Sequence, residues 1–254
     1  MVDISEKIEQ DYGDELLWSE PINYKGITLY PVICKDIRAF TASVYPLLYD
    51  PLRYPTEIST LPRLYFLTDI LNHTNDPVYL SQNIMLTHLY ISLTSLLKLV
   101  LKEQKVEFIE NNKRWIIKVC GEEKPVEIKA KDFEVIRQII LHQNGVNYDD
   151  TFIHEDIRQW IEEQEKADKT PPITTGDYIE AYMIQLNIND LKEIKKVPLR
   201  QFNHIVDKFL TRENYVMRTT AAMSGFVTFN DKIDHWLVTN KKNSIYDKYF
   251  KEVK

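Results

Sequence analysis

The hydrophobic pattern changes its period twice between residues 81 and 143, and this change determines the fold class. Residues 81–102 are rich in leucine and carry no acid or base before Lys98, which is typical of a buried helix. From 106 to 129 apolar and polar residues alternate, as they do in half-buried strands. A helical period then returns, with one face formed by Phe133, Ile136, Ile139 and Ile140. The pattern predicts a predominantly helical α+β fold with a small antiparallel β-meander near 106–129.

Turn and capping residues support this division. The pair Asn111-Asn112 can form a tight turn in the meander, because Asn tolerates positive φ. Asp132 is a good N-cap for the helix that follows, and Asn144-Gly145 is a good C-terminal stop. We therefore expect a helix that begins at Asp132 and ends before Gly145.

The segment that precedes the apolar helix predicts one strand and two shorter helices. The strand is Ile27–Val32, which Pro31 stops. Residues 35–49 have the period of a helix that Pro46 kinks or ends. Residues 64–72 predict a second short helix.

A proline-rich segment marks the best domain boundary. Residues 168–176 (DKTPPITTG) combine two prolines with small polar residues, as linkers do. Asp150 is expected to cap a short helix before this segment. After it, the pattern predicts helices near 177–187, 190–196, 199–212 and 213–223, and a short strand at Phe226–Phe229. The predicted domains are an acidic N-terminal arm at 1–20, an α+β domain at 21–167, a linker at 168–176 and a helical C-terminal domain at 177–254.

The charge of the chain is concentrated at its start. Residues 1–20 carry seven acids and one base, whereas acids and bases balance in the rest of the chain. The whole chain therefore has a net charge of −6. A neutral body with an acidic arm lacks the positive field that a general nucleic-acid binder needs. The arm is interpreted either as a solvated start or as a segment that binds a partner.

Cysteine usage and hydropathy indicate a compartment. Cys34 and Cys120 are too few for a disulfide framework, and both are interpreted as small buried hydrophobes in a reducing environment. The N-terminus has no basic region followed by an apolar run, so it does not resemble a signal peptide. Residues 80–97 contain no charged side chain, but several polar residues interrupt them. We therefore expect a core helix and no membrane insertion.

The sequence contains no motif for catalysis or cofactor binding. Its six glycines are isolated, so no phosphate-binding loop can be built. The six histidines include no pair at four-residue spacing, and there is no Cys-x-x-Cys. Ser224-Gly225 lacks the preceding glycine of a nucleophile elbow. We predict that the chain is not an enzyme and takes no cofactor, metal or small-molecule substrate.

The C-terminal helices have a superficial likeness to a helix-turn-helix. Residues 190–218 hold seven bases and four acids. An excess of three positive charges is modest for a DNA-binding element, so a DNA-binding regulator is kept as an alternative and not as the main interpretation.

Several stretches, in order, resemble tail-assembly proteins of contractile-tailed bacteriophages, mostly phages with Gram-positive hosts. They are YKGITLYPVICKDIRAF, EISTLPRLYFL, KDFEVIRQIILHQNG and YIEAYMIQLNINDLKEIKKVPLRQF. The last also resembles the helical end of phage tail assembly chaperones, in which two helices precede an Arg-x-Phe, here Arg200-Gln201-Phe202. FVTFNDKIDHW is similar to the family's ending, so the resemblance runs from about residue 24 to 237.

The resemblance implies a protein that binds another tail component, such as a tape-measure, hub or baseplate protein, during virion morphogenesis. It also implies a place in the host cytoplasm or in the virion tail. The alternative within this class is a structural subunit of the tail or baseplate, which would also associate with copies of itself. Partner binding favours exposed aromatic residues. The candidate partner-binding residues are Tyr45, Tyr49, Tyr54, Trp236, Tyr246 and Tyr249.

Overall fold

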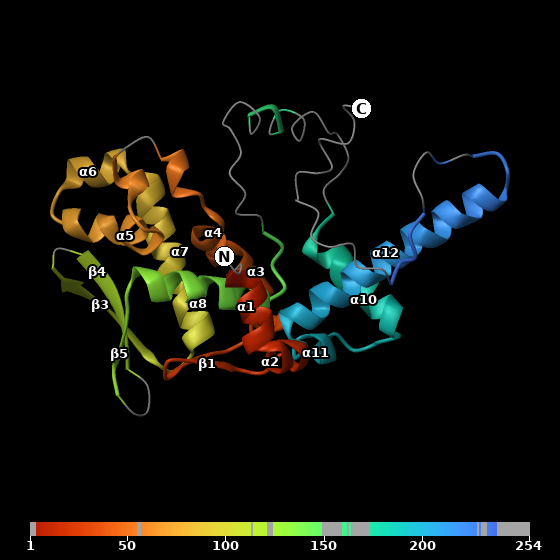
Figure 1. Ribbon diagram of the computed structural model, residues 1–254, viewed down its shortest axis with the longest axis horizontal. Coiled ribbons are helices and arrows are strands. Elements are labelled where there is room, and N and C mark those ends of the chain that lie inside the picture. The colour runs from red at the N-terminus through yellow and green to blue at the C-terminus, as the bar shows by residue number, and fades with distance from the viewer. Residues whose placement is uncertain are drawn as a thin grey trace. The chain divides into compact units, whose positions relative to one another are not determined.

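The computed structural model describes residues 4–54, 57–112, 114–120, 124–148, 159–161, 163, 173–227, 229 and 233–237. The chain divides into two compact units (Figure 1). The first consists of Met1–Val146 with Lys195–Gln201, and the second of Asn147–Ile194 with Phe202–Lys254. Helices predominate and two small antiparallel sheets accompany them, which confirms the predicted fold class.

The acidic N-terminal segment is helical and belongs to the first unit. It forms α1 (Ile4–Asp11) and α2 (Gly13–Trp18). Ile8 and Leu16 are each 2% exposed, and α1 contacts helix α8 (Ala130–Gln143). The expected separate arm is therefore packed on the unit, because each short helix contributes one apolar residue to the core.

A small hairpin follows the two N-terminal helices. Strand β1 (Ile22–Tyr24) pairs with β2 (Ile27–Leu29) through a two-residue turn at Lys25 and Gly26, which have φ of 53° and 85°. Positive φ at both positions is the geometry of a type I′ turn. The strand is shorter than the predicted Ile27–Val32, because the chain leaves the hairpin at Tyr30, whose N–H donates to Val100 O at 2.8 Å.

The predicted helix at 35–49 is split near Pro46. After the 3₁₀ turn η1 (Cys34–Asp36), α3 spans Ile37–Ser43 and α4 spans Tyr45–Leu48. Proline has no N–H to continue the hydrogen-bond ladder of the first helix, but it is tolerated in the first turn of a new one. The 3₁₀ turns η2 (Pro51–Arg53) and η3 (Glu57–Thr60) lead to α5 (Arg63–Thr68) and η4 (Asp69–His73).

The apolar segment forms the central helix of the first unit. Helix α6 (Pro77–Gln82) is followed at Asn83 by α7 (Ile84–Leu101), which contacts α3, α4, α5, β2 and the first strand of the larger sheet. Its buried residues are Leu86, Leu89, Leu93, Leu96, Leu97, Val100 and Leu101. The prediction of a core helix here is confirmed, although α7 begins three residues later than expected because Asn83 interrupts the helix.

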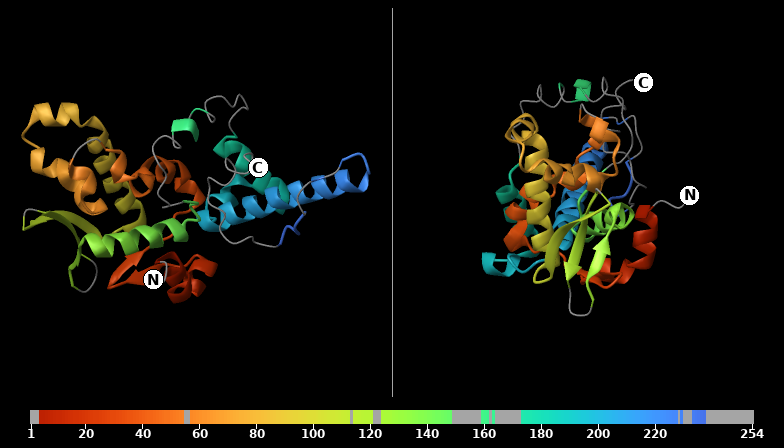
Figure 2. Two further views of the ribbon diagram at one scale, coloured as in Figure 1. Left: turned by 45° about the horizontal axis from the view of Figure 1, so that its top comes forward. Right: turned by 90° about the vertical axis from the view of Figure 1, so that its left-hand side faces the viewer.

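The meander is present with the predicted topology. Strands β3 (Lys105–Asn111), β4 (Arg114–Cys120) and β5 (Val126–Ile128) pair antiparallel in that order, with Phe108 opposite Ile117 and Ile117 opposite Ile128. Asn112 has a φ of 51°, as its place in the turn requires. The sheet lies alongside α7 and α8 (Figure 2), and α5 contacts its middle strand.

Helix α8 has the predicted core face and C-terminus but a different start. Its stripe of apolar residues is at most 1% exposed. Gly145, at a φ of 62°, donates to His142 O at 3.1 Å, and Val146 donates to Leu141 O at 2.9 Å, which is a Schellman ending. The predicted N-cap is wrong, since Lys129 is the N-cap and Asp132 lies in the first turn. There Asp132 accepts a bond from Lys25 Nζ at 2.5 Å, which joins the hairpin turn to the helix.

A short segment from late in the chain completes the first unit. Pro198 forms a β-bridge with Ile33, and Cys34 N–H donates to Val197 O at 2.8 Å. Leu199 N–H donates to Val32 O at 2.8 Å. Residues Lys195–Gln201 are therefore held by the chain that follows β2, far away in sequence.

The described part of the second unit consists mainly of helices. Helix α10 (Thr175–Leu186) begins with a capping box between Thr174 and Asp177 and is followed by α11 (Leu191–Ile194). Helix α12 (Leu199–Met223) is one continuous helix of 25 residues, where the pattern predicted two. The Tyr182 and Phe202 rings pack 5.1 Å apart and are both buried.

Some predicted features of this half have a different outcome. Phe226, Val227 and Phe229 are not in a strand, so the predicted strand is wrong at these positions. Residues 159–161 are helical, but most of the helix expected after Asp150 lies outside the described residues. The same is true of residues 168–172 of the expected linker, whose role as a boundary stays a prediction. The compact units themselves change at Val146, at Ile194 and at Gln201.

Candidate functional site

The first group of candidate aromatic residues lies mainly in the core. Tyr49 and Tyr54 are 8% and 9% exposed and surround Phe66, with ring centroids at 5.9 and 5.5 Å. Tyr45 is 45% exposed, and its ring meets Tyr49 edge-on at 5.8 Å. The expectation of an exposed aromatic surface is therefore wrong for Tyr49 and Tyr54, because the Tyr49 ring stacks on Phe66 of α5 and the Tyr54 ring meets it edge-on. It holds for Tyr45.

The second group is placed only in part. Trp236 is half-buried, and its indole lies 5.9 Å from the His235 ring, which in turn lies 5.2 Å from Tyr215 of α12. Tyr246 and Tyr249 lie outside the described residues. The structure thus brings Trp236 close to α12.

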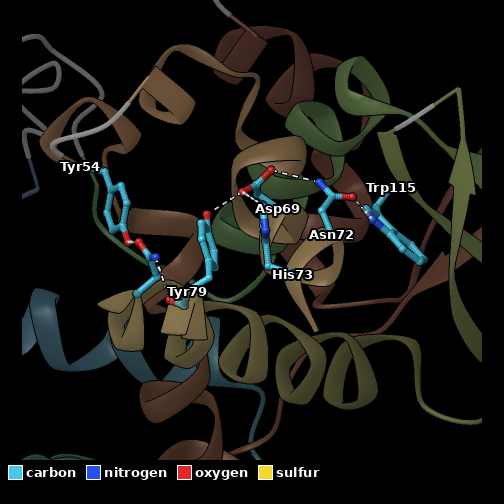
Figure 3. Close-up of polar contacts among 7 residues, drawn as sticks. Tyr54, Asp69, Asn72, His73, Tyr79 and Trp115 are labelled. Atoms are coloured by element: carbon cyan, nitrogen blue, oxygen red, sulfur yellow. Dashed lines mark hydrogen bonds and ion pairs between the residues drawn. The ribbon is translucent and has the colours of Figure 1, made fainter. Parts of the chain in front are cut away.

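A chain of polar side chains connects η4 with α6 and β4 (Figure 3). The Asp69 carboxylate, in a residue only 8% exposed, accepts hydrogen bonds from Tyr79 Oη at 2.9 Å and from Asn72 Nδ2 at 3.1 Å. His73 Nε2 lies 3.8 Å from the same carboxylate, and the His73 and Tyr79 rings stack at 3.7 Å. Asn72 Oδ1 accepts a bond from Trp115 Nε1 at 2.7 Å. The buried carboxylate is therefore well supplied with donors.

The same network reaches the start of α7. Tyr54 Oη donates to Asn83 Oδ1, and Asn83 Nδ2 donates to Tyr79 O at 2.8 Å. Burial, followed by the hydrogen bond to Asp69 and its negative charge, raises the pKa of the Tyr79 phenol. Tyr79 thus remains a donor at neutral pH. A carboxylate, an imidazole and a phenol can transfer protons. Here, however, the carboxylate and the phenol are hydrogen-bonded to each other, which favours a structural role in holding η4 and α6 together.

Two arginines form a second internal cluster that the hydrophobic pattern does not reveal. Arg137 is 2% exposed, and its Nε donates to Leu47 O at 2.6 Å. Arg63 Nη1 donates to Tyr49 O, and Glu134 lies 3.5 Å from Arg63 and 3.7 Å from Arg137. The two guanidinium groups therefore satisfy carbonyls at the C-terminal end of α4, where a helix leaves its last acceptors free.

Neither cysteine is in a disulfide, and Cys34 is placed as predicted. It is 6% exposed, and burial raises the pKa of its thiol to about 11. Such a thiol is almost fully protonated at neutral pH and is a poor nucleophile. Cys120 is half-buried at the end of β4. Within the described ranges, no three His, Cys, Asp or Glu side chains are grouped as a metal site would require. The adjacent polar residues His154, Glu155 and Asp156 lie outside those ranges.

Several apolar side chains are left on the surface. In the second unit α12 carries an exposed set after its first ten residues, and α10 carries Ile184 at 78% exposed. In the first unit Leu17 and Trp18 of α2 are 70% and 72% exposed. Contiguous apolar patches on a surface mark interaction sites, whereas single exposed apolar residues are common.

One described helix, α7, is long and apolar enough to span a membrane by length and composition alone. In the structure 39% of its residues are buried. A core helix meets the same criterion, and the buried leucines of α7 face α3, α4 and α5.

No protein-family model matches this chain, and no curated protein or solved structure matches it significantly.

Proposed function

We propose that this chain is a phage tail-assembly protein that binds another tail component in the host cytoplasm during virion morphogenesis. The observation that carries the proposal is the exposed apolar face of α12. Its first part is buried at Phe202 and Val206, whereas Met217 and Met223 are 67% and 87% exposed. The resemblance to tail-assembly proteins suggests the process in which the chain acts. The exposed apolar face of α12 offers a surface on which a partner can bind.

The spacing of the exposed residues suits a helical or extended partner. Leu210 and Met217 are seven residues apart, as are Val216 and Met223, so each pair lies on one side of the helix. The two pairs lie about 100° apart around the helix, so the four side chains form a broad apolar stripe two turns and more in length. An amphipathic segment that lays its apolar face along such a stripe is a common mode of recognition.

The basic residues of the same region give less support to DNA binding. Arg200 donates to the His142 carbonyl, and the Arg218 guanidinium lies 4.8 Å above the Phe229 ring. Two of the bases that would face phosphates are therefore engaged within the chain. The structural-subunit alternative uses the same α12 face, with a neighbouring virion protein or a second copy as its partner.

The test of the proposal is removal of the gene from its phage, followed by electron microscopy of the lysate. We expect filled or empty heads without tails. Normal infectious particles would overturn the proposal. Mass spectrometry of wild-type virions separates the alternatives, since an assembly factor is absent from finished particles and a structural subunit is abundant.

Plasmid-borne variants then test the surface. Met217→Asp places a charge in the apolar stripe, and we expect it to fail to restore plaques to the deleted phage. Thr211→Asp is the matched control, because Thr211 is exposed, lies on the other side of α12 from the stripe and gains the same charge. Equal restoration by both variants would remove α12 as the binding surface.

A further inference from the structure

Helix α2 holds two large apolar side chains in solvent. Leu17 and Trp18 are 70% and 72% exposed, whereas the preceding Leu16 is 2% exposed. Successive residues of an α-helix are rotated by about 100°, so a helix that buries Leu16 turns the next two side chains away from the core. The exposure of Leu17 and Trp18 is thus a consequence of how α2 is seated.

Hydrogen bonds at its C-terminal end fix the position of α2. Glu20 N–H donates to Glu15 O at 2.8 Å, and Ser19 adopts a positive φ of 56°, which closes the helix. The buried Gln143 side chain donates from Nε2 to Glu20 O and to Leu29 O, both at 3.0 Å. The helix end is therefore tied to α8 and to β2, and Trp18 cannot turn inward without breaking these bonds.

The exposed pair lies in a strongly acidic setting. Exposed or half-exposed carboxylates flank it on α2 and its two ends, at Asp11, Asp14, Glu15 and Glu20. Lys7 is the one base in the first twenty residues. This charge distinguishes the α2 surface from the α12 stripe.

We propose that Leu17, Trp18 and the flanking carboxylates form a docking surface for a basic amphipathic segment of another protein. Its apolar side chains would cover Leu17 and Trp18, and its Lys or Arg residues would pair with the carboxylates. A cation can also lie on the face of the indole, which adds to the attraction. The inference rests on the proposed function only in taking the partner to be a tail component.

Charge argues against the other occupants of this surface. A second copy would bring the same acidic helices and be repelled, as would the phosphates of a nucleic acid or of an anionic membrane. A purely apolar segment would leave the carboxylates without partners. A basic segment with one apolar face satisfies both parts of the surface.

The test uses the full chain and two fluorescent model helices of about 18 residues, which share one leucine pattern and carry either Lys or Glu at every polar position. Fluorescence anisotropy should report binding of the Lys peptide, weakened as NaCl rises from about 50 to about 300 mM, and no binding of the Glu peptide. Trp18→Ala should weaken binding of the Lys peptide about tenfold or more. Leu17→Ser should weaken it in the same direction.

Matched variants separate this surface from general attraction to an acidic protein. Asp14→Asn with Glu20→Gln should weaken binding, whereas Glu180→Gln with Glu193→Gln removes two exposed carboxylates from the second unit and should not. Leu52→Ala controls for Trp18→Ala, because Leu52 is an exposed apolar residue of the first unit, at 60%. Binding that is absent, or equally sensitive to the control variants, would overturn the inference.

The two proposals fail separately. If the deleted phage makes no tails but Trp18→Ala restores them fully, the docking surface is refuted and the assembly function stands. If the deleted phage is normal while the Lys peptide still depends on Trp18, the assembly function is refuted and the docking surface stands.

Discussion

Buried polar side chains do much of the positioning in the first unit. Gln143 is fully buried and joins two chain segments through their carbonyls. Asn144 Oδ1 accepts a bond from Val32 N–H at 2.8 Å, and Arg137 satisfies the end of α4. Hydropathy patterns do not find such residues, because they are polar residues at buried positions. Their partners are carbonyl and N–H groups far away in sequence.

Tyr79 tests the energetic weight of such a network. Tyr79→Phe removes the hydroxyl that donates to Asp69 and leaves the ring stacked on His73. We expect a loss of about 1–3 kcal/mol in the free energy of unfolding, because a buried carboxylate loses a donor. Tyr90→Phe is the control, because Tyr90 is a half-buried residue of α7, and it should change the free energy of unfolding little. A denaturant titration of the three proteins measures both effects, and equal values for the two variants would assign no role to the hydroxyl.

Cys34 should be nearly inert in the folded protein. Its thiol is buried and its raised pKa keeps it protonated below about pH 11, so little thiolate is present at pH 8. Cys120→Ser leaves Cys34 as the only thiol, and this variant should react with an aromatic disulfide reagent far more slowly when folded than in guanidinium chloride. Rapid reaction of the folded variant would contradict the described environment of Cys34. Cys34→Ser provides the matched measurement for Cys120.

At the scale of elements, the long periodic signals and the turn residues of the meander and of α8 gave correct predictions, whereas the short elements were often missed. The meander, α7 and α8 each extend far enough for their apolar period to be distinctive. Strand β1 has only three residues and was not predicted, and a single helix replaces the two expected over 199–223. The aromatic content of the segment suggested a binding surface that included Tyr49 and Tyr54, but it could not show that both rings are buried against Phe66. The exposure of Trp18 likewise depends on how α2 packs, which composition does not contain.

The contact between Lys25 and Asp132 links two elements, and its contribution should depend on pH. Burial raises the pKa of Asp132, but the hydrogen bond and charge of Lys25 and a bond from the Lys129 backbone lower it by more, so the net shift is downward. A carboxylate with a lowered folded pKa stabilises the fold above about pH 4 and loses this effect as pH falls through the folded value. The Asp132 hydrogen bond raises the pKa of Lys25, so the upper limit lies above about pH 10.

The corresponding measurement compares Lys25→Met with the wild type across this range. At pH 7 the variant should have the lower urea midpoint, and the difference should shrink as pH falls and Asp132 takes up its proton in the folded state as well. Lys98→Met is the control, since Lys98 is an exposed lysine of α7. A difference that persists unchanged at pH 2 would show that Lys25 acts through packing and not through its charge.

At the scale of the whole molecule, the chain does not follow a simple order of domains. The first unit is completed by residues 195–201, which come after part of the second unit in sequence. The predicted order of an α+β domain, a linker and a helical domain misses this return, because a β-bridge between Ile33 and Pro198 leaves no local signal. The first unit therefore needs the C-terminal part of the chain to be complete.

This return makes a specific prediction for limited proteolysis. We expect the first cut in residues 168–176, because small polar residues and prolines are typical of an exposed linker, and the cut should give a C-terminal fragment of about 80 residues. That fragment carries Val197 and Leu199, which hydrogen-bond to the first unit, and Leu199 is 3% exposed. The two fragments should therefore elute together in gel filtration and separate only in denaturant.

Leu199→Ala should release the fragment under milder conditions, because it removes buried apolar contact at the junction, whereas Lys196→Ala at an exposed neighbour should not. Fragments that separate at once without denaturant would show that residues 195–201 do not belong to the first unit.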